Sequence, residues 1–301
     1  MLDYAALSAL AAVVREGSFE RAARSLHVTP SAVSQRIRGL EERVGSALVV
    51  RGQPCTATDL GQRLCQHLDQ VRLLELDLHG ALPGRLGGAA DTVARVPLPV
   101  AVNADSLATW FAPAAAAFAA QAPVLLELLV DDQDHTAEGL RSGRVLAAVT
   151  GSARAPTGCN SRPLGAMRYV AAASPGFVAR HFASGVGAGS LARAPSLAFN
   201  GKDDLQARWV RRLCHRDVEM PRHTLPSTQA FLTAALAGMG WGLQPLSLAA
   251  PHLQDGSLVE LVPATPLDVP LFWQHARAAS SLLEGLGQAV VAAAAAALRR
   301  R

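Results

Sequence analysis

Residues 18–45, SFERAARSLHVTPSAVSQRIRGLEERVG, constrain the fold more than any other stretch of this chain. The stretch opens with a serine suited to cap a helix, and the first short helix breaks at His27. A second helix starts at once, because Thr29 can cap it and Pro30 fits a first turn that needs no backbone N–H. The closing glycine is a helix stop. These residues therefore predict a helix, a tight turn and a second helix.

The second of these helices has two different faces. Apolar residues recur at steps of four, three and four and must pack against something: Val33, Ile37, Leu40 and Val44. The opposite face carries Ser31, Gln35, Arg38 and Glu42, with Ser34 on the flank. Hydroxyl, amide and guanidinium groups on an exposed helix can reach base edges and phosphates in a major groove. Any half-buried surface helix shows the same pattern, so this helix alone leaves both interpretations open.

The flanking segments complete a small domain. Residues 3–16 begin at Asp3 as a cap, end before Gly17 as a stop, and have an apolar stripe at helical spacing: Tyr4, Leu7, Leu10 and Val14. Two short apolar runs, 48–50 and 55–57, surround a Gly/Pro turn and predict a hairpin. Arg51 lies at the base of this hairpin, where it can reach a phosphate or a narrow minor groove. A solvated arginine on an ordinary hairpin is the alternative.

Residues 17–51, GSFERAARSLHVTPSAVSQRIRGLEERVGSALVVR, resemble the N-terminal winged helix-turn-helix of LysR-type bacterial transcriptional regulators. The resemblance implies that this domain binds double-stranded operator DNA. The residues that it places at the DNA are Ser18, Thr29, Pro30, Ser31, Ser34, Gln35, Arg38 and Arg51.

A long helix follows, with Thr58 as its cap. Its apolar positions alternate steps of four and three, which is the spacing of a coiled-coil seam: Leu60, Leu64, His67, Val71, Leu74 and Leu78. We expect this seam to pair with a second subunit, and packing on the chain's own domain is the alternative. The Gly- and Pro-rich residues 80–88 predict a hinge.

The remaining two thirds of the chain alternate strands with helices. The first block predicts strands at 98–102, 124–130 and 145–150, with helices at 106–120 and 136–142. Strands joined by helical crossovers imply a parallel sheet with helices on its faces. After a crossover at 156–163, a second block predicts strands 169–173 and 196–199 and helices 175–182, 204–214 and 228–237. The chain then returns through 263–270 to strand 271–274 and a terminal helix, 281–298, which implies two lobes with a cleft between them.

This half resembles the effector-binding domain of LysR-type regulators, which is similar to type II periplasmic binding proteins. Five phrases resemble the subfamily that senses arginine and lysine and governs their export, also described as inhibitors of chromosome initiation: NADSLATWF (103–111), DDQDHT (131–136), PLGAMRYVAAASPGFV (163–178), STQAFLTAALAGMGWG (227–242) and PLFWQ (270–274). The expected fold is thus α/β, with a winged domain at 1–58, a linker helix and hinge at 59–90 and an effector domain at 91–301. Lobe I spans about 91–160 and 268–301, and lobe II spans about 161–267.

Ligands of parallel α/β sheets bind beyond the carboxyl ends of the strands. The first two strands end in Asn103, Asp105 and Ser106, and in Asp131, Asp132, Gln133 and His135. The Ser106 hydroxyl and N–H fit an α-carboxylate, and the three aspartates fit an α-ammonium and a cationic side chain. Candidates across the cleft are Phe199, Asn200, Thr228 and Gln229. Each of these residue types is also common as a cap in loops, which is the alternative. Trp110 and Trp273 are expected in the core.

Composition excludes several classes of protein. Half of the 301 residues are hydrophobic, which excludes a disordered chain, and the net charge of +4 does not by itself indicate a nucleic-acid partner. The four cysteines stand far apart without metal-ligand spacing, as expected for free thiols in the cytoplasm. We find no G-x-S-x-G elbow, no glycine-rich phosphate loop and no metal quartet, so we expect neither an enzyme nor a cofactor. The alanine run 292–297 fits a terminal helix better than a membrane span.

These patterns together predict a dimeric or tetrameric transcription regulator that senses lysine or arginine and controls genes such as an amino-acid exporter. The resemblance also implies contact with RNA polymerase and no contact with a membrane. Two alternatives stay open. One is an effector-independent DNA-binding protein that acts on replication or chromosome structure, and the other is a regulator that senses a different small molecule. A small-molecule binding protein or transport receptor would need only the C-terminal half, so the winged domain argues against that class.

Overall fold

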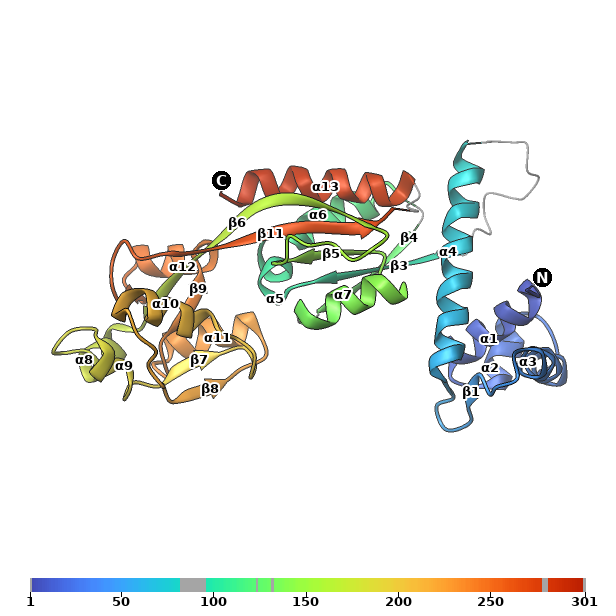
Figure 1. Cartoon of the computed structure of the whole chain (residues 1–301), viewed down its shortest axis with the longest axis horizontal. Helices are drawn as coiled ribbons and strands as arrows, with labels where there is room; N and C mark the ends of the chain where they lie inside the picture. Colours follow the sequence, from blue (N-terminus) through green and yellow to red (C-terminus); the bar gives the residue numbers. More distant parts are fainter. Residues whose placement is uncertain (1, 82–95, 123, 131–132, 278–280, 300–301) are drawn as a thin grey trace.

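The structure is a computed structural model that describes residues 2–81, 96–122, 124–130, 133–277 and 281–299. A small helical domain and the long helix α4 lie at one end of the molecule, and two groups of strands and helices extend away from them (Figure 1). The expected class, a helical N-terminal domain followed by an α/β half, is confirmed.

The N-terminal domain has three helices and a hairpin. The helices are α1 (Tyr4–Glu16), α2 (Phe19–Ser25) and α3 (Pro30–Val44), and strands β1 (Val49–Val50) and β2 (Thr56–Ala57) pair antiparallel. The predicted caps are confirmed, since the side chains of Asp3, Ser18 and Thr29 accept hydrogen bonds from backbone N–H groups at the three helix starts. Gly17 and Gly45 follow α1 and α3 with φ of 65° and 73°, a conformation that favours glycine.

The apolar stripe of α3 forms the core of this domain. Val33, Ile37 and Leu40 are buried, together with seven residues of α1. The stripe expected on α1 was partly wrong, because Tyr4 is 45% exposed, and Leu7, Leu10 and Val13 are the large side chains that α1 buries. Because three helices converge on one core, the outer face of α3 is left to solvent.

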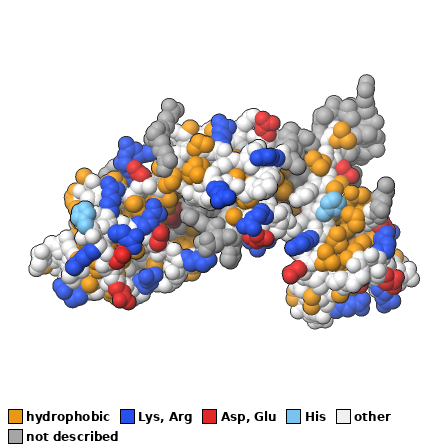
Figure 2. Space-filling view, viewed as in Figure 1, with side chains coloured by type: hydrophobic (Ala, Val, Ile, Leu, Met, Phe, Trp, Pro, Cys, Tyr) orange, Lys and Arg blue, Asp and Glu red, His pale blue; other side chains and the backbone are white. Residues whose placement is uncertain are grey.

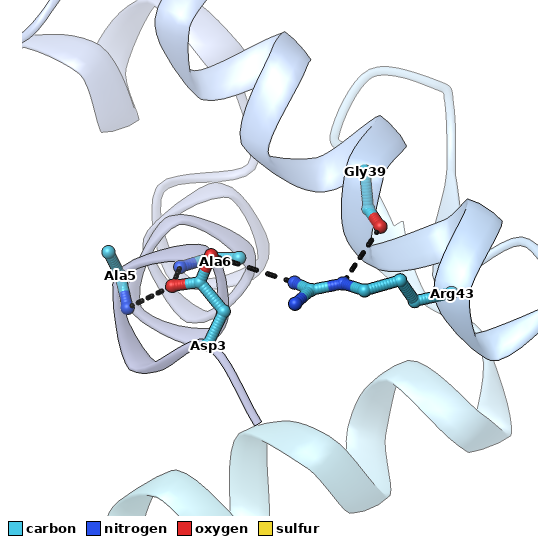
Figure 3. A network of polar contacts seen from close by, with 5 residues as sticks. All are labelled: Asp3, Ala5, Ala6, Gly39 and Arg43. Carbon is cyan, nitrogen blue, oxygen red and sulfur yellow. Dashed lines mark hydrogen bonds and ion pairs between the residues drawn. The ribbon is translucent and has the colours of Figure 1, made fainter. Parts of the chain in front are cut away.

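The start of α1 is tied to the end of α3 by a small polar network (Figure 3). Asp3 accepts from the backbone N–H groups of Ala5 and Ala6 and lies 3.6 Å from the Arg43 guanidinium. Arg43 also donates to the Gly39 carbonyl oxygen at 3.2 Å. The network is solvent-exposed, so it adds orientation more than stability.

Helix α4 (Asp59–Ala81) joins this domain to the rest of the chain. The Thr58 hydroxyl accepts from the Gly61 N–H at 3.1 Å and donates to the Ala47 carbonyl oxygen, so the cap also anchors the helix to the hairpin. Cys65 and Leu68 pack on the winged domain. The predicted seam is divided. Leu64 packs on the winged domain and His67 stacks on Tyr4, as in the alternative, whereas Leu60, Leu74 and Leu78 are exposed at 37%, 52% and 51%. Of the predicted hinge, residues 82–88 lie outside the described residues.

Lobe I is built on parallel strands. It contains β3 (Val96–Val102), α5 (Ala104–Ser106), a π-helical turn (Leu107–Phe111), α6 (Ala112–Ala119), β4 (Val124–Val130), α7 (Gln133–Ser142) and β5 (Ala147–Thr150). Strand β3 pairs parallel with both β4 and β5, which confirms the predicted parallel arrangement. The terminal helix α13 (Ser281–Ala297) packs on α6 (Figure 1). Trp110 and Trp273 are buried, as expected.

The chain crosses from lobe I to lobe II after the first block, as expected, but not through a connecting segment at 156–163, because residues 159–163 already belong to a long strand. Strand β6 (Cys159–Ala173) pairs antiparallel with β11 (Leu267–Ala276), and together they run from lobe I into lobe II (Figure 1). The prolines Pro163 and Pro270 made both segments look like loops. A bulge at Leu164, which has no partner on β11 and precedes Gly165 at φ +124°, accommodates the irregular pairing there.

Lobe II is built around a second small sheet and the far end of β6. Its elements are α8 (Pro175–His181), α9 (Ala188–Leu191), β7 (Ser196–Ala198), α10 (Leu205–Cys214), β8 (Arg222–Thr224), α11 (Thr228–Leu236), β9 (Gly242–Pro245), α12 (Leu246–Gln254) and β10 (Val259–Glu260). Strands β9 and β10 pair with β6, and β7 pairs with β8. The sequence did not predict α9, β8, β9, α12 or β10.

Candidate functional site

The outer face of α3 presents the polar residues that the sequence placed there. Ser31, Gln35 and Arg38 are exposed, and Ser34 is half-buried. Among the described residues, Arg38 has no hydrogen-bond or ion-pair partner, so its guanidinium is available to an external acceptor. Arg36 is exposed beside it and was not among the predicted DNA contacts.

Two predicted DNA contacts are already used as helix caps. The Thr29 hydroxyl accepts from the Ala32 N–H at 3.2 Å and lies 3.0 Å from the Ser31 hydroxyl. Ser18 accepts from the Arg21 N–H and donates to Glu20 at 2.6 Å. These side chains therefore position the helices, whereas Pro30 is exposed at the first turn of α3.

Arg51 lies at the hairpin, as predicted, and is exposed. Its guanidinium carbon is 5.4 Å from the centre of the Phe19 ring at the start of α2. A cation over an aromatic face is held weakly, by about 0.5–1 kcal/mol at exposed sites. The contact keeps Arg51 on the same side of the domain as α2 while its donors stay accessible.

A cleft of about 520 Å³ lies between the two lobes. This volume falls within the range of small-molecule sites, about 300–1,000 Å³. Lobe I contributes Asn103, Asp105 and Val130, and lobe II contributes residues of β9, α11 and the segment 199–208. The charged residues among those described in the lining are Asp105, Lys202, Asp203, Asp204 and Arg208.

Asp105 is the central acidic group of the cleft. One carboxylate oxygen accepts from the Thr228 hydroxyl at 2.7 Å, and the other accepts from the Tyr169 hydroxyl at 2.7 Å. These three residues come from α5, α11 and β6, so the cluster bridges lobe I and lobe II. Each carboxylate oxygen has a second lone pair, which leaves Asp105 able to accept from a ligand as well.

The surroundings of Asp105 perturb its titration. Burial raises the pKa of the Asp105 carboxyl above its usual value, the hydrogen bonds from Thr228 and Tyr169 act to lower it, and the negative charge of Asp203 raises it further. Burial also holds the pKa of Tyr169 well above the usual tyrosine value, so its hydroxyl stays a donor. A buried carboxylate with a raised pKa gains from a cationic partner.

The other cleft aspartates have structural partners. Asp203 accepts from the backbone N–H groups of Phe199 and Leu205 and shapes the loop after β7. Asp204 is exposed and lies 3.8 Å from Arg208. Asp105 therefore stands apart as the acidic group whose partners are only neutral hydroxyls.

The structure brings five of the predicted ligand residues into the cleft lining: Asn103, Asp105, Phe199, Asn200 and Thr228. Ser106 is fully buried and does not line the cleft, and Gln229 is exposed outside the lining. Asp131 and Asp132 lie outside the described residues, as do the side chains of Gln133 and His135. The roles assigned to all of these residues stay predictions.

Sequence reasoning missed six polar residues of the lining. Four of them follow β7, in the segment 202–208: Lys202, Asp203, Asp204 and Arg208. The other two are Tyr169 and Gln244. Both sit within apolar strands, where a lone polar side chain was the available signal. Tyr169 had been assigned to a strand without a role, and the strand of Gln244 had not been predicted. Chain folding places them beside Asp105 and Thr228, which are remote in sequence.

Three further observations concern metal binding, the cysteine thiols and membrane-spanning helices. Within the described ranges no group of three or more His, Cys, Asp or Glu side chains is arranged to hold a metal ion. The cysteines of the described chain are free thiols, and burial raises the pKa of Cys65 to about 11. No described helix is both long and apolar enough to cross a membrane.

Two family models match the chain. Residues 4–62 match the bacterial regulatory helix-turn-helix protein, lysR family, and residues 95–295 match the LysR substrate binding domain. Among curated proteins, the HTH-type transcriptional regulator ArgP of Pseudomonas aeruginosa is 46% identical over 296 residues, which cover 98% of this chain and 96% of the relative. The HTH-type transcriptional regulator LysG of Mycobacterium bovis is 47% identical over 293 residues, 97% of this chain and 94% of the relative.

Solved structures give the same result. The crystal structure of ArgP from Mycobacterium tuberculosis matches with a TM-score of 0.80 and 44% identity, and each chain is covered completely. Full-length LysG from Corynebacterium glutamicum, determined with the bound effector Arg, matches with a TM-score of 0.68 and 38% identity, covering 99% of this chain and all of LysG. These relatives are transcription regulators and not enzymes. The chain thus belongs to the LysR family of bacterial helix-turn-helix transcriptional regulators.

Proposed function

We propose that this regulator binds double-stranded operator DNA through α3 and the hairpin and binds arginine or lysine in the cleft between its lobes. Residues 1–58 form the DNA-binding unit, 59–90 the dimerising linker and 91–301 the effector unit. Binding of the effector shifts the arrangement of paired DNA-binding domains. The regulator acts in the cytoplasm on genes such as an amino-acid exporter and contacts RNA polymerase there.

The observation that carries the effector assignment is the Asp105 cluster. A buried carboxylate held by two neutral hydroxyls, at 2.7 Å each, needs a positive charge for compensation. A guanidinium or ammonium group that enters the cleft supplies that charge. The arginine bound to LysG of Corynebacterium glutamicum supports the same ligand class for this chain.

A titration tests the proposal directly. Labelled upstream DNA from the chain's own genome is titrated with the protein, with and without arginine or lysine, at fixed salt. We expect DNA binding whose affinity or footprint changes with the amino acid. DNA binding that ignores both amino acids would favour the architectural or replication-related alternative, and a response only to other metabolites would favour a different effector.

Replacing Arg38 by alanine is expected to weaken operator binding about tenfold or more, because a base-reading arginine contributes about 1–3 kcal/mol. Electrophoretic mobility shift measures the change. Arg180→Ala removes an exposed arginine of α8 and serves as the matched control, with no expected effect on DNA affinity. Equal affinities for the Arg38→Ala variant and the parent would remove Arg38 from the DNA interface.

Replacing Leu74 by aspartate is expected to break the proposed dimer of α4. The side chain is 52% exposed in the single chain, and a charge at a coiled-coil seam loses apolar contact and repels its symmetry mate. Sedimentation should show a shift from dimer to monomer at micromolar concentration. Leu125→Asp is the control, since Leu125 is 50% exposed on β4, away from the seam. A dimer that survives Leu74→Asp would place the subunit contact elsewhere.

Hydrophobic side chains gather on the visible face of the winged domain and the adjoining part of α4 (Figure 2). Among the described residues of the winged domain and the start of α4, Leu2, Tyr4 and Leu60 are each at least 37% exposed. Exposed apolar surface of this kind supports a subunit contact that involves the winged domain as well as α4.

A further inference from the structure

Gln244 is the polar group of the cleft that the structure leaves least satisfied. It lies on β9, has 0% exposure and lines the cleft. Neither its Oε1 nor its Nε2 has a hydrogen-bond partner among the described residues. Buried amide groups are almost always paired, so an unpaired one that faces a binding cleft calls for an external partner.

The position of Gln244 relates it to the Asp105 cluster. Strand β9 pairs antiparallel with β6, where Gln244 faces Val170 and Pro245 faces Tyr169. Helix α11 packs on β9, and its first residue, Thr228, donates to Asp105. Gln244 therefore lies on the sheet face that α11 covers, with Val170, whereas Tyr169 lies on the other face. Both residues line the cleft, Gln244 from the lobe II side.

The two sides of the cleft offer complementary chemistry. On lobe I, Asp105 accepts hydrogen bonds, and the Asn103 Oδ1 is buried with no partner among the described residues. That side suits a cationic group. On lobe II, Gln244 offers N–H donors, and the first residue of α11, Thr228, lines the same cleft, which suits a carboxylate. A zwitterionic amino acid with a cationic side chain carries both groups at opposite ends.

We propose that Gln244 recognises the α-carboxylate of the effector, with Nε2 donating to a carboxylate oxygen while Oε1 accepts from the adjacent α-ammonium. This inference rests on the proposed function, in which the cationic side chain is bound at Asp105. Gln244 is then the residue that makes the cleft prefer a basic amino acid to the corresponding amine, which lacks the carboxylate.

The test compares arginine with agmatine, which is arginine without its α-carboxylate, by calorimetry on the full-length protein. A hydrogen bond to a charged group contributes about 1.5–3 kcal/mol, so Gln244→Leu should weaken arginine binding about tenfold to a hundredfold. The loss for arginine should exceed the loss for agmatine by about tenfold or more. Gln244→Glu places a carboxylate against that of arginine, so it should weaken arginine binding while agmatine binding is retained or strengthened.

The melting temperatures of two variants distinguish a ligand-binding role of Gln244 from a structural role. Gln244→Leu removes an amide without protein partners, so its melting temperature should be no lower than that of the parent. Gln274→Leu is the matched control, because Gln274 is 2% exposed but donates to the Ser152 carbonyl oxygen at 2.8 Å. This control should melt at a lower temperature and keep the parent's ratio of arginine to agmatine affinity.

Each remaining outcome decides between hypotheses. Equal losses for arginine and agmatine in Gln244→Leu overturn the carboxylate contact. Unchanged affinity for both ligands means that ordered water or the fold alone satisfies Gln244, which also overturns the inference. A parent protein that binds neither arginine nor lysine overturns the proposed function itself, whereas a parent that binds arginine and tolerates Gln244→Leu overturns only the role of Gln244.

Discussion

Replacing Asp105 by asparagine is expected to weaken arginine or lysine binding at least about thirtyfold, since loss of one member of a buried charge pair removes about 2–5 kcal/mol. Asparagine has nearly the same shape, and its Oδ1 can still accept from one of the two hydroxyls, Tyr169 or Thr228, that now donate to the carboxylate. The variant therefore removes the charge and little else. Calorimetric titration with arginine measures the loss.

The stability of this variant follows from the pKa of Asp105. Burial raises that pKa, so the folded state binds a proton more tightly than the unfolded chain does. Stability consequently falls as the pH rises through the window between the ordinary carboxyl value and the raised one. At neutral pH the ionised form is the unfavourable one, and Asp105→Asn should melt no lower than the parent. Loss of effector binding then cannot be attributed to unfolding.

The same pKa predicts a pH dependence of binding. Because Asp105 takes up its proton at a higher pH than an ordinary aspartate, arginine affinity should begin to fall above the usual carboxyl range as the solution is acidified. Asp204→Asn is the control: Asp204 also lines the cleft but is exposed, where solvent screens its charge. If Asp105→Asn and Asp204→Asn weakened arginine binding equally, the general negative charge of the cleft, and not Asp105 in particular, would hold the ligand.

Replacing Gly61 by alanine is expected to destabilise the winged domain by about 2 kcal/mol, although alanine favours helices. A Cβ at Gly61 meets the Leu48 carbonyl carbon at 3.0 Å and lies even closer to its oxygen. That oxygen already accepts from the Thr58 N–H at 3.0 Å, at the cap of α4. The hairpin or the start of α4 must shift, and the orientation of the hairpin relative to α3 shifts with it. Operator affinity should fall in parallel.

Two spectroscopic signals distinguish this local effect from global unfolding. All four tryptophans, Trp110, Trp209, Trp241 and Trp273, lie in the effector half, so their fluorescence reports that half alone. Gly61→Ala should lower the denaturant midpoint of the helical circular dichroism component of the winged domain and leave the fluorescence midpoint in place. Gly39→Ala is the matched control within α3, because nothing lies within 4 Å of its added Cβ. It should stabilise the domain by about 0.4–1 kcal/mol, and destabilisation by both variants would contradict the steric explanation.

Local sequence signals were sufficient to predict the helix ends and the buried face of α3 in the N-terminal domain. Asp3, Ser18, Thr29, Pro30 and Gly45 are caps and stops whose effects act within one helical turn, and the structure confirms each of them. The stripe of Val33, Ile37 and Leu40 identified the buried face of α3 for the same reason, since side-chain periodicity depends only on helix geometry.

The pairing of strands that are remote in sequence could not be predicted from such local signals. Strands β6 and β11 contain Pro163 and Pro270, which are ordinary loop signals, and only their mutual register with the bulge beside Gly165 makes them strands. The short strand of Gln244 likewise exists because β6 provides its hydrogen-bond partners. Pairing energies between residues remote in sequence leave no local periodicity to detect.

The amino-acid sequence by itself determined the helix-turn-helix, the exposed polar face of α3, the parallel core of lobe I and the resemblance to one family, because these depend on short-range spacing and on recognisable phrases. Only the tertiary structure decided which polar groups share the cleft. It placed Tyr169 and Thr228 at 2.7 Å from Asp105, buried Ser106 away from the lining and brought the unpaired amide of Gln244 into the same cavity. The physical reason is that burial and hydrogen-bond partnership arise from packing two lobes together, and neither is a property of one segment.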